Sequence, residues 1–482
     1  MNAVAPASSP PPRRRWPRRL LLAILLLVGL PAGYYFYASW ALKSDIARAL
    51  AETDALDPRW RLDDLEADSK TYPDADNSAL QIVNVGRLMG RGQPSAHKDY
   101  GPIFDHLPPA AQLNPQQIAL LRECFDSIPE ALVEARKLKD MPHGRFAARR
   151  DPSGLWVMFP DHHHARPVCD LLEHEAMLKV QFGDPDAALE ACRAQFNVAR
   201  AMADDFSIIS YFIRVGCDTS LVTTLERVLA QSDKCHDTPL KHMQSLLHEE
   251  HEQIGPQWIT ALRGERAESH RFYEPMITGK KRWLQMAETM RIRVGWEDQL
   301  NHYLPMRLIK DFPQHLRLRN EIIEAARLPL HEQLERFAEL EQKLNCGDAR
   351  KTGLAQFLPL LPLEMPKVGA RHLRSQALLR AAEAALACER YRLERRSWPD
   401  SLDALVKAGL LDLVPADPFD GQPLRLAKHK EGVTVYSVGE DKCDNGGQID
   451  RDRPREPGAD VGFRMWDPLN RRQPPRPPVD VP

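Results

Sequence analysis

The stretch PVCDLLEHEAMLKVQFGDPDAALEACRAQFNVARAMA, residues 167–203, decides the fold class of this 482-residue chain. Apolar side chains recur at helical spacing in both of its halves: Leu171, Leu178 and Phe182, then Leu189, Cys192, Phe196 and Ala199. Between the halves, Gly183-Asp184-Pro185 breaks the first helix and caps the second. The stretch therefore predicts two amphipathic helices packed as a hairpin.

This helix–Gly-Asp-Pro–helix unit resembles one tetratricopeptide hairpin, with Ala187-Ala188-Leu189 opening its second helix. No two further copies follow at a period of about 34 residues, and a repeat array needs about three copies. A generic helical hairpin is therefore the interpretation that the residues favour.

Helical spacing of apolar residues is also found over the rest of residues 43–365, with breaks at proline and glycine clusters. Asn77 and Asn114-Pro115 are typical helix starts, whereas the weakly patterned stretches 90–112 and 140–166 are predicted to be loops. Further helices are predicted over 78–89, 115–138, 205–231, 238–254, 257–270, 314–326, 330–344 and 368–396. The predicted fold class is therefore mainly α, built of helical hairpins.

A single apolar span lies near the N-terminus. Residues 1–19 carry five arginines and no acidic residue, and Leu20–Leu42 has no formal charge over 23 residues. A helix of that length is about 34 Å long, enough to cross a hydrocarbon core. Aromatic residues cluster at its far end, as at a membrane interface: Tyr34, Tyr35, Tyr37 and Trp40. We therefore predict a cytoplasmic basic tail, 1–19, and a single transmembrane anchor, 20–42.

A cleaved signal peptide is the alternative to this anchor. Its apolar region would be about 7–15 residues long and would be followed by small residues, which this span lacks. Pro31 is the weak point of the anchor, since a proline can end a helix early. Because arginines near a span stay on the cytoplasmic side, the sequence predicts a single-pass inner-membrane protein. The bulk of the chain would then be extracytoplasmic, in the periplasm.

Net charge indicates which partners the chain can bind, and the spacing of its cysteines indicates which redox or metal motifs it can contain. The 463 residues after the basic tail carry 60 basic and 67 acidic groups, a net charge of about −7. Nucleic acid is therefore excluded as an expected partner, and the membrane and other envelope proteins remain. The eight cysteines lie at least 18 residues apart, so no C-x-x-C redox or metal motif is present. Disulfides are permitted in an oxidising compartment but are not required by a core of this size.

Residues 366–467 are predicted to form a small C-terminal α+β module, a long helix followed by a β-hairpin. Its elements follow one another in this order: the helix to 396, a stop at Ser397-Trp398-Pro399-Asp400, a short helix over 401–410, a turn at 417–421, and strands at 424–426 and 433–437. Residues 468–482 are a proline-rich tail without a core-forming pattern.

Short motifs accompany this module in a defined order: Tyr391, Trp398-Pro399, Asp417-Pro418, Gly421, Tyr436-Ser437-Val438-Gly439, Asp441, Gly446-Gly447 and Asp460-Val461-Gly462. Over about 95 residues, their order resembles the C-terminal half of the major pseudopilins of type II secretion. Pilins begin with a cleavage site and a glutamate that Leu20–Leu42 lacks, so assembly into a pseudopilus is not expected. The whole chain also resembles uncharacterised membrane-anchored proteins of planctomycete bacteria.

The pseudopilin resemblance implies a calcium site in the loop 439–462. Asp441 and Asp460 fall on the acidic positions that match the calcium loop of that family, and Asp444 lies between them. Calcium takes six to eight oxygen ligands, so it would pin a loop that is too polar to order itself by burial. Basic residues in the loop offset the acidic charge, and a solvated acidic loop is the alternative.

Two histidine-rich stretches carry candidate transition-metal ligands. Asp161-His162-His163-His164 is followed by Glu173-His174-Glu175, whereas His248, His251 and Glu252 share one helical face. The zincin pattern H-E-x-x-H needs histidines four residues apart, and His248 and His251 are three apart. A polar loop and an exposed charged face are therefore the favoured interpretations. No G-x-S-x-G, G-x-x-x-x-G-K-[ST] or G-x-G-x-x-G motif is present.

The sequence therefore predicts a membrane-anchored extracytoplasmic protein that acts as a scaffold or interaction protein. No residue is nominated as catalytic. The alternative is a metal-dependent envelope hydrolase with a metal site around His162–His174.

Overall fold

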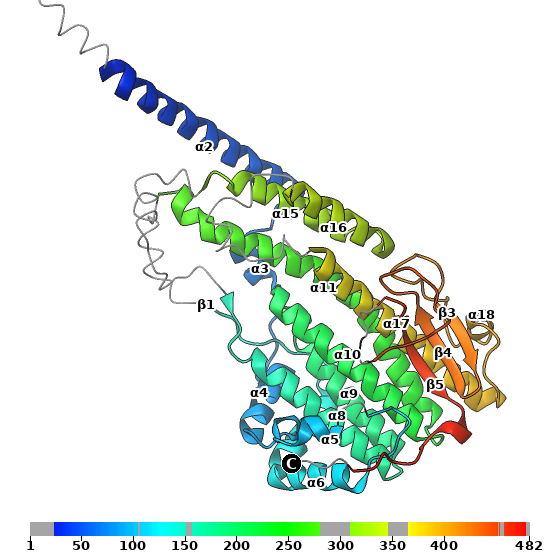
Figure 1. The fold of residues 1–482 in the computed structure, drawn as a ribbon. Helices are drawn as coiled ribbons and strands as arrows, with labels where there is room; N and C mark the ends of the chain where they lie inside the picture. The colour runs from blue at the N-terminus through cyan, green and yellow to red at the C-terminus, as the bar shows by residue number, and fades with distance from the viewer. Residues whose placement is uncertain are drawn as a thin grey trace, which may run out of the picture. The chain divides into compact units, whose positions relative to one another are not determined.

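The computed structural model describes residues 24–104, 107–150, 157–279, 309–345, 365–451, 453 and 457–478. Within these residues the chain is mainly helical and has two small antiparallel sheets (Figure 1). The predicted mainly α class is confirmed. The chain divides into two compact units: Met1–Pro58 with Met276–Arg317, and Arg59–Pro275 with Leu318–Pro482.

The first unit contains the apolar N-terminal helix. A π-helical turn, Leu25–Gly29, leads directly into α2, Leu30–Leu56 (Figure 1). Helix α2 is long and apolar enough to cross a membrane, and none of its most apolar 18-residue window is buried. The predicted basic tail and the first residues of the predicted anchor lie outside the described residues.

Helix α2 does not end where the sequence predicted. It runs through Pro31 and continues 14 residues beyond Leu42. Pro31 is the second residue of α2 and directly follows the π-helical turn, a local irregularity of the kind at which helices accommodate a proline. On the polar part of α2, Asp45 accepts a hydrogen bond of 2.9 Å and Glu52 one of 2.7 Å from the Arg317 guanidinium.

The second unit is built around the predicted hairpin, which is confirmed. It consists of α8, Ala165–Gln181, and α9, Pro185–Arg200, and α10, Ile208–Gln231, packs against both (Figure 1). Asp184 caps α9 by accepting a 3.1 Å hydrogen bond from the Ala187 N–H. Gly183 adopts a φ of 86°, which a residue with a side chain rarely adopts.

Helices α4, Ser78–Met89, α6, Pro115–Ser127, and α7, Pro129–Lys137, follow the predicted helix starts. Asn114 and Gln117 form a reciprocal capping box at the start of α6. The prediction of one helix over 115–138 is wrong, because Ile128 is non-helical and Pro129 opens a new helix.

The opposite error occurs at α11, Asp237–Ile277, which was predicted as two helices. Pro256 lies inside this continuous helix. Buried apolar residues continue in helical phase across the proline: Leu247, Ile254, Trp258 and Ala261. Burial of this stripe offsets the cost of about 3 kcal/mol that an interior proline carries.

Three further helices match their predictions within a few residues: α15, Phe312–Ala326, α16, Leu330–Asn345, and α17, Met365–Arg395. Helix α17 packs against α10 and α16 and against the C-terminal sheet. The predicted loops contain short elements: α5, Tyr100–Phe104, and the strands β1, Arg149–Arg150, and β2, Val157–Met158. Outside these loops lies α3, Leu62–Asp68, for which no separate helix was predicted. Cysteines in the described residues are all unpaired: Cys124, Cys169, Cys192, Cys217, Cys235, Cys388 and Cys443.

The C-terminal sheet contains the predicted hairpin and one strand more. After the short helix α18, Leu402–Lys407, strands β3, Arg425–His429, β4, Gly432–Ser437, and β5, Val461–Trp466, form an antiparallel sheet in the order β3-β4-β5 (Figure 1). Strand β5 was not predicted from its residue pattern. Pairing with β4 and packing against α17 make it almost wholly buried.

Two charged residues anchor this region. The buried Asp417 accepts hydrogen bonds from the Phe419 and Val438 N–H groups, both of 2.9 Å. Arg471, only 6% exposed, donates two hydrogen bonds of 2.9 Å to the two carboxylate oxygens of Glu389 on α17. The start of the tail, predicted to have no core-forming pattern, is therefore held by a buried ion pair.

Candidate functional site

The predicted calcium ligands lie in one loop, and each accepts hydrogen bonds from the backbone. Asp441 accepts from the N–H groups of Cys443, at 3.0 Å, and Gly458, at 2.8 Å. Asp460 accepts from the N–H groups of Asn445, at 3.3 Å, and Gly447, at 2.7 Å. The bond from Cys443 is local, whereas those from Gly458, Asn445 and Gly447 connect opposite sides of the loop.

Asp444 is held differently. Its carboxylate accepts hydrogen bonds of 2.9 Å from the Gly446 N–H and from the Tyr436 hydroxyl, and lies 3.2 Å from Nε of Arg425. The Gly446 N–H lowers the pKa of Asp444, whereas burial raises the pKa of Asp460. Among the described residues, the three aspartates do not form a cluster of converging ligand atoms. Calcium binding in this loop stays a prediction.

The histidines of 162–164 do not converge on one point. His162 is buried, with Nε2 3.0 Å from Asp205 Oδ2 and Nδ1 3.2 Å from Ser210 Oγ. The sequence pattern did not indicate this serine–histidine–aspartate contact, in which Ser210 is fully buried. His163 instead contacts the Pro160 carbonyl, 2.6 Å from its Nδ1.

Glu173, His174 and Glu175 also point to separate partners. Glu173 accepts a 2.5 Å hydrogen bond from Ser220, and Glu175 pairs with Arg136 at 2.6 Å. His174 Nε2 lies 2.8 Å from the Tyr100 hydroxyl, and burial lowers the pKa of His174 to about 4. The residues expected for the metal site of a hydrolase are therefore dispersed among structural contacts.

The other histidine pair has a partner that the sequence did not indicate. Glu383 on α17 faces His248 and His251 on α11, with its two carboxylate oxygens 3.0 Å from His248 Nδ1 and 2.8 Å from His251 Nε2. One ligand atom from each of these three residues lies within 4.8 Å of the other two. His251 and Glu383 are buried, whereas His248 is exposed. The face of α11 that was predicted to be exposed and charged therefore supplies His248 and His251 to a cluster that α17 completes with Glu383.

Glu252, the next residue on α11, approaches the same cluster from its other side. Its Oε1 lies 3.3 Å from His251 Nδ1. Glu252 also lines a hollow of about 530 Å³ between α11, the end of α3 and residues 203–206, together with Lys70, Arg214 and Arg263. The hollow carries both signs of charge and borders the histidine cluster.

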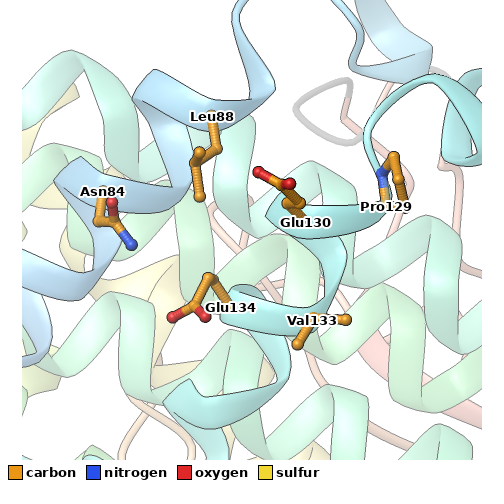
Figure 2. Close-up of a pocket in the computed structure, with 6 residues that line it drawn as sticks. All are labelled: Asn84, Leu88, Pro129, Glu130, Val133 and Glu134. Carbon is orange, nitrogen blue, oxygen red and sulfur yellow. The ribbon is translucent and has the colours of Figure 1, made fainter.

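A second hollow, of about 450 Å³, lies between α4 and α7 (Figure 2). Asn84 and Leu88 come from α4, and the first turns of α7 supply the other side: Pro129, Glu130, Val133 and Glu134. Leu88 is 41% and Val133 53% exposed, so two large aliphatic side chains face solvent beside two carboxylates.

The fold and these sites define a mainly helical protein with a small C-terminal antiparallel sheet and one apolar N-terminal helix. No family model matches the chain, and neither the curated proteins nor the solved structures give a match.

Proposed function

We propose that this chain is a single-pass membrane protein whose helical body lies outside the cytoplasm and binds other envelope proteins. The observation that carries the proposal is the apolar stretch of α2, which is long enough to span a bilayer and leaves its side chains exposed. The five arginines before it favour a cytoplasmic N-terminus and an inner-membrane location.

The hollow between α4 and α7 is the surface that we propose for a protein partner (Figure 2). Exposed aliphatic side chains beside carboxylates suit a partner segment that presents an apolar side chain next to a lysine or arginine. Glu134 already pairs with Lys137 at 2.6 Å, so Glu130 is the carboxylate that such a cation would meet.

The pseudopilin resemblance stays part of the proposal for the C-terminal module. Its support is the order of a long helix, a short helix and antiparallel strands, together with the buried Asp417 that organises the turn before β3. A stabilising cap on the body is the role that we propose for this module.

Topology is tested with a reporter fused after Pro482. We expect activity only outside the cytoplasm and retention of the whole chain in the membrane after alkaline extraction. Reporter activity in the cytoplasm, or release of the body as a soluble protein, would contradict the anchor.

The partner surface is tested by a photo-crosslinking residue at Val133 in the native envelope. Ile209, 66% exposed on α10, is the matched control position. We expect a discrete adduct at Val133 that is absent at Ile209 and disappears when Leu88→Glu is added. Equal adducts at the two positions, or none at Val133, would remove this hollow as a partner site.

A further inference from the structure

We infer that His248, His251 and Glu383 form a binding site for one divalent transition-metal ion, of which zinc fits best. The site goes beyond the proposed anchoring and binding role and is independent of it. Its three donors converge from two helices that are far apart in sequence, with Glu383 oxygens 3.0 Å from His248 Nδ1 and 2.8 Å from His251 Nε2.

The fold brings these donors together from two long helices, α11 and α17. His248 and His251 are three residues apart on α11, so they project from the same face. Gln376 on α17 donates a 3.1 Å hydrogen bond to the His251 carbonyl and ties the two helices two turns from Glu383. Small side chains around Glu383 allow close helix packing, and all are fully buried: Ala381, Ala382, Ala384 and Ala385.

His251 lies between two carboxylates, which calls for positive charge at this ring. A neutral imidazole has one N–H and one lone pair, yet His251 faces the Glu383 carboxylate with Nε2 and lies 3.3 Å from Glu252 with Nδ1. The buried Nδ1 makes no hydrogen bond of good geometry. A neutral ring therefore turns a lone pair toward one of the two carboxylates.

A second proton on the ring removes this conflict, and so does a metal cation between Nε2 and Glu383, which is the alternative that we infer. The lone pair of His251 Nε2 then binds the metal, and Nδ1–H becomes a donor to Glu252. Metal-binding histidines characteristically donate their other N–H to a carboxylate in this way, which sets the tautomer and the ring orientation. Glu252 is exposed on its outer side, so its side chain is free to complete that hydrogen bond.

The distances suit a small ion. Zinc binds nitrogen at about 2.0–2.1 Å, so donors in a tetrahedral site lie about 3.3 Å apart. The two contacts of Glu383, made by different oxygens, widen by a few tenths of an ångström, whereas the widest separation among the three donors, up to 4.8 Å, closes to reach this geometry. The His248 side chain is 52% exposed and can rotate toward the ion.

The donor set and its exposure define the kind of site. Two imidazoles and one carboxylate are typical of zinc and related transition metals, whereas calcium takes oxygen ligands alone. Three protein ligands leave a fourth position, and the exposed side at His248 lets water or another small ligand reach it. A closed structural site would bury all of its ligands.

The test is zinc binding to the full chain in detergent, after chelator treatment and dialysis. We expect one zinc per chain, and a loss of at least 100-fold in affinity for His248→Ala and for Glu383→Gln. His242→Ala is the matched control, since His242 is another exposed histidine on α11, and it should bind zinc as wild type does. Glu252→Gln should weaken binding by about 10–100-fold, the range found when the carboxylate partner of a metal-bound histidine is removed.

Each outcome bears directly on the site. His248→Ala alters an exposed side chain, so retention of the wild-type circular dichroism spectrum and melting midpoint separates loss of a ligand from loss of fold. The absence of stoichiometric zinc in the wild type would overturn the inference. It would also be overturned if His248→Ala and Glu383→Gln bound zinc as tightly as His242→Ala. The three residues would then be linked by hydrogen bonds alone.

Discussion

Replacing Arg471 with methionine should destabilise the body far more than its position in a polar tail suggests. Arg471 donates hydrogen bonds of 2.9 Å to each oxygen of Glu389, one of 2.9 Å to the Trp466 carbonyl and one of 2.5 Å to the Ser232 carbonyl. Methionine retains an unbranched stem but donates none of them. Arg471→Met therefore removes one partner from a buried ion pair and leaves two carbonyls without their donor.

The magnitude follows from what remains around Glu389. Removing one partner of a buried ion pair costs about 3–5 kcal/mol, because the other charge is left buried. Arg392 still donates two hydrogen bonds, of 2.7 and 2.8 Å, to the Glu389 carboxylate. We therefore expect the lower end of the range, a loss of about 3 kcal/mol in the free energy of unfolding.

The assay is urea unfolding of the full chain in detergent, followed by tryptophan fluorescence. Arg336→Met is the control, since Arg336 and Glu339 form a pair of 2.6 Å on the surface, 36% and 54% exposed, and such pairs contribute about 0–1 kcal/mol. A double-mutant cycle with Glu389→Gln isolates the coupling between Arg471 and Glu389. A loss no larger than that of the control, or a coupling below about 0.5 kcal/mol, would refute the reasoning.

Two further predictions concern pH and calcium. Burial alone would raise the pKa of Glu389, but hydrogen bonds and charge from Arg392 and Arg471 outweigh it and hold the pKa below the usual 4.5. The ionised Glu389 therefore stabilises the folded state fully above about pH 4.5, and this contribution is lost as the pH falls below that value. The urea concentration at the unfolding midpoint should fall over the same pH range, and it should fall less in Glu389→Gln. If the loop 439–462 binds calcium with a Kd of about 10⁻⁴–10⁻³ M, millimolar calcium should add about 0.4–1.4 kcal/mol and raise the melting midpoint of the wild type, not of Asp441→Ala. An equal rise in both, or none in the wild type, would leave Asp441 and Asp460 as backbone caps only.

Local patterns in the sequence predicted most of the helices because their caps and apolar stripes lie within a few residues of each other. Asn114, Asp184 and Gly183 act as their residue types indicate. Prolines were the main source of error. Pro129 separates two helices and Pro256 does not, and the difference depends on tertiary burial around α11, which no local pattern contains.

The candidate sites depend even more on tertiary contacts that no local sequence pattern contains. The shared face of His248 and His251 was visible from their spacing, but Glu383 lies 132 residues beyond His251 and its approach depends on how α17 packs. The contact of Arg471 with Glu389 spans 82 residues, and β5 becomes a central part of the core only by pairing with β4. Each of these features is a long-range contact between residues that are unremarkable in their own neighbourhoods.

The length of α2 bears on how a bilayer would connect to whatever follows this helix. Together with the π-helical turn before it, α2 forms a helix of 32 residues, Leu25–Leu56, about 48 Å long at 1.5 Å per residue, whereas a hydrocarbon core is about 30 Å thick. If the helix spans a bilayer, the surplus of about 18 Å would act as a rigid spacer, stiffened where Arg317 donates hydrogen bonds to Asp45 and Glu52, two turns apart on one face. Inserting a single residue into such a spacer turns everything beyond it by about 100°, whereas a flexible linker would absorb the change.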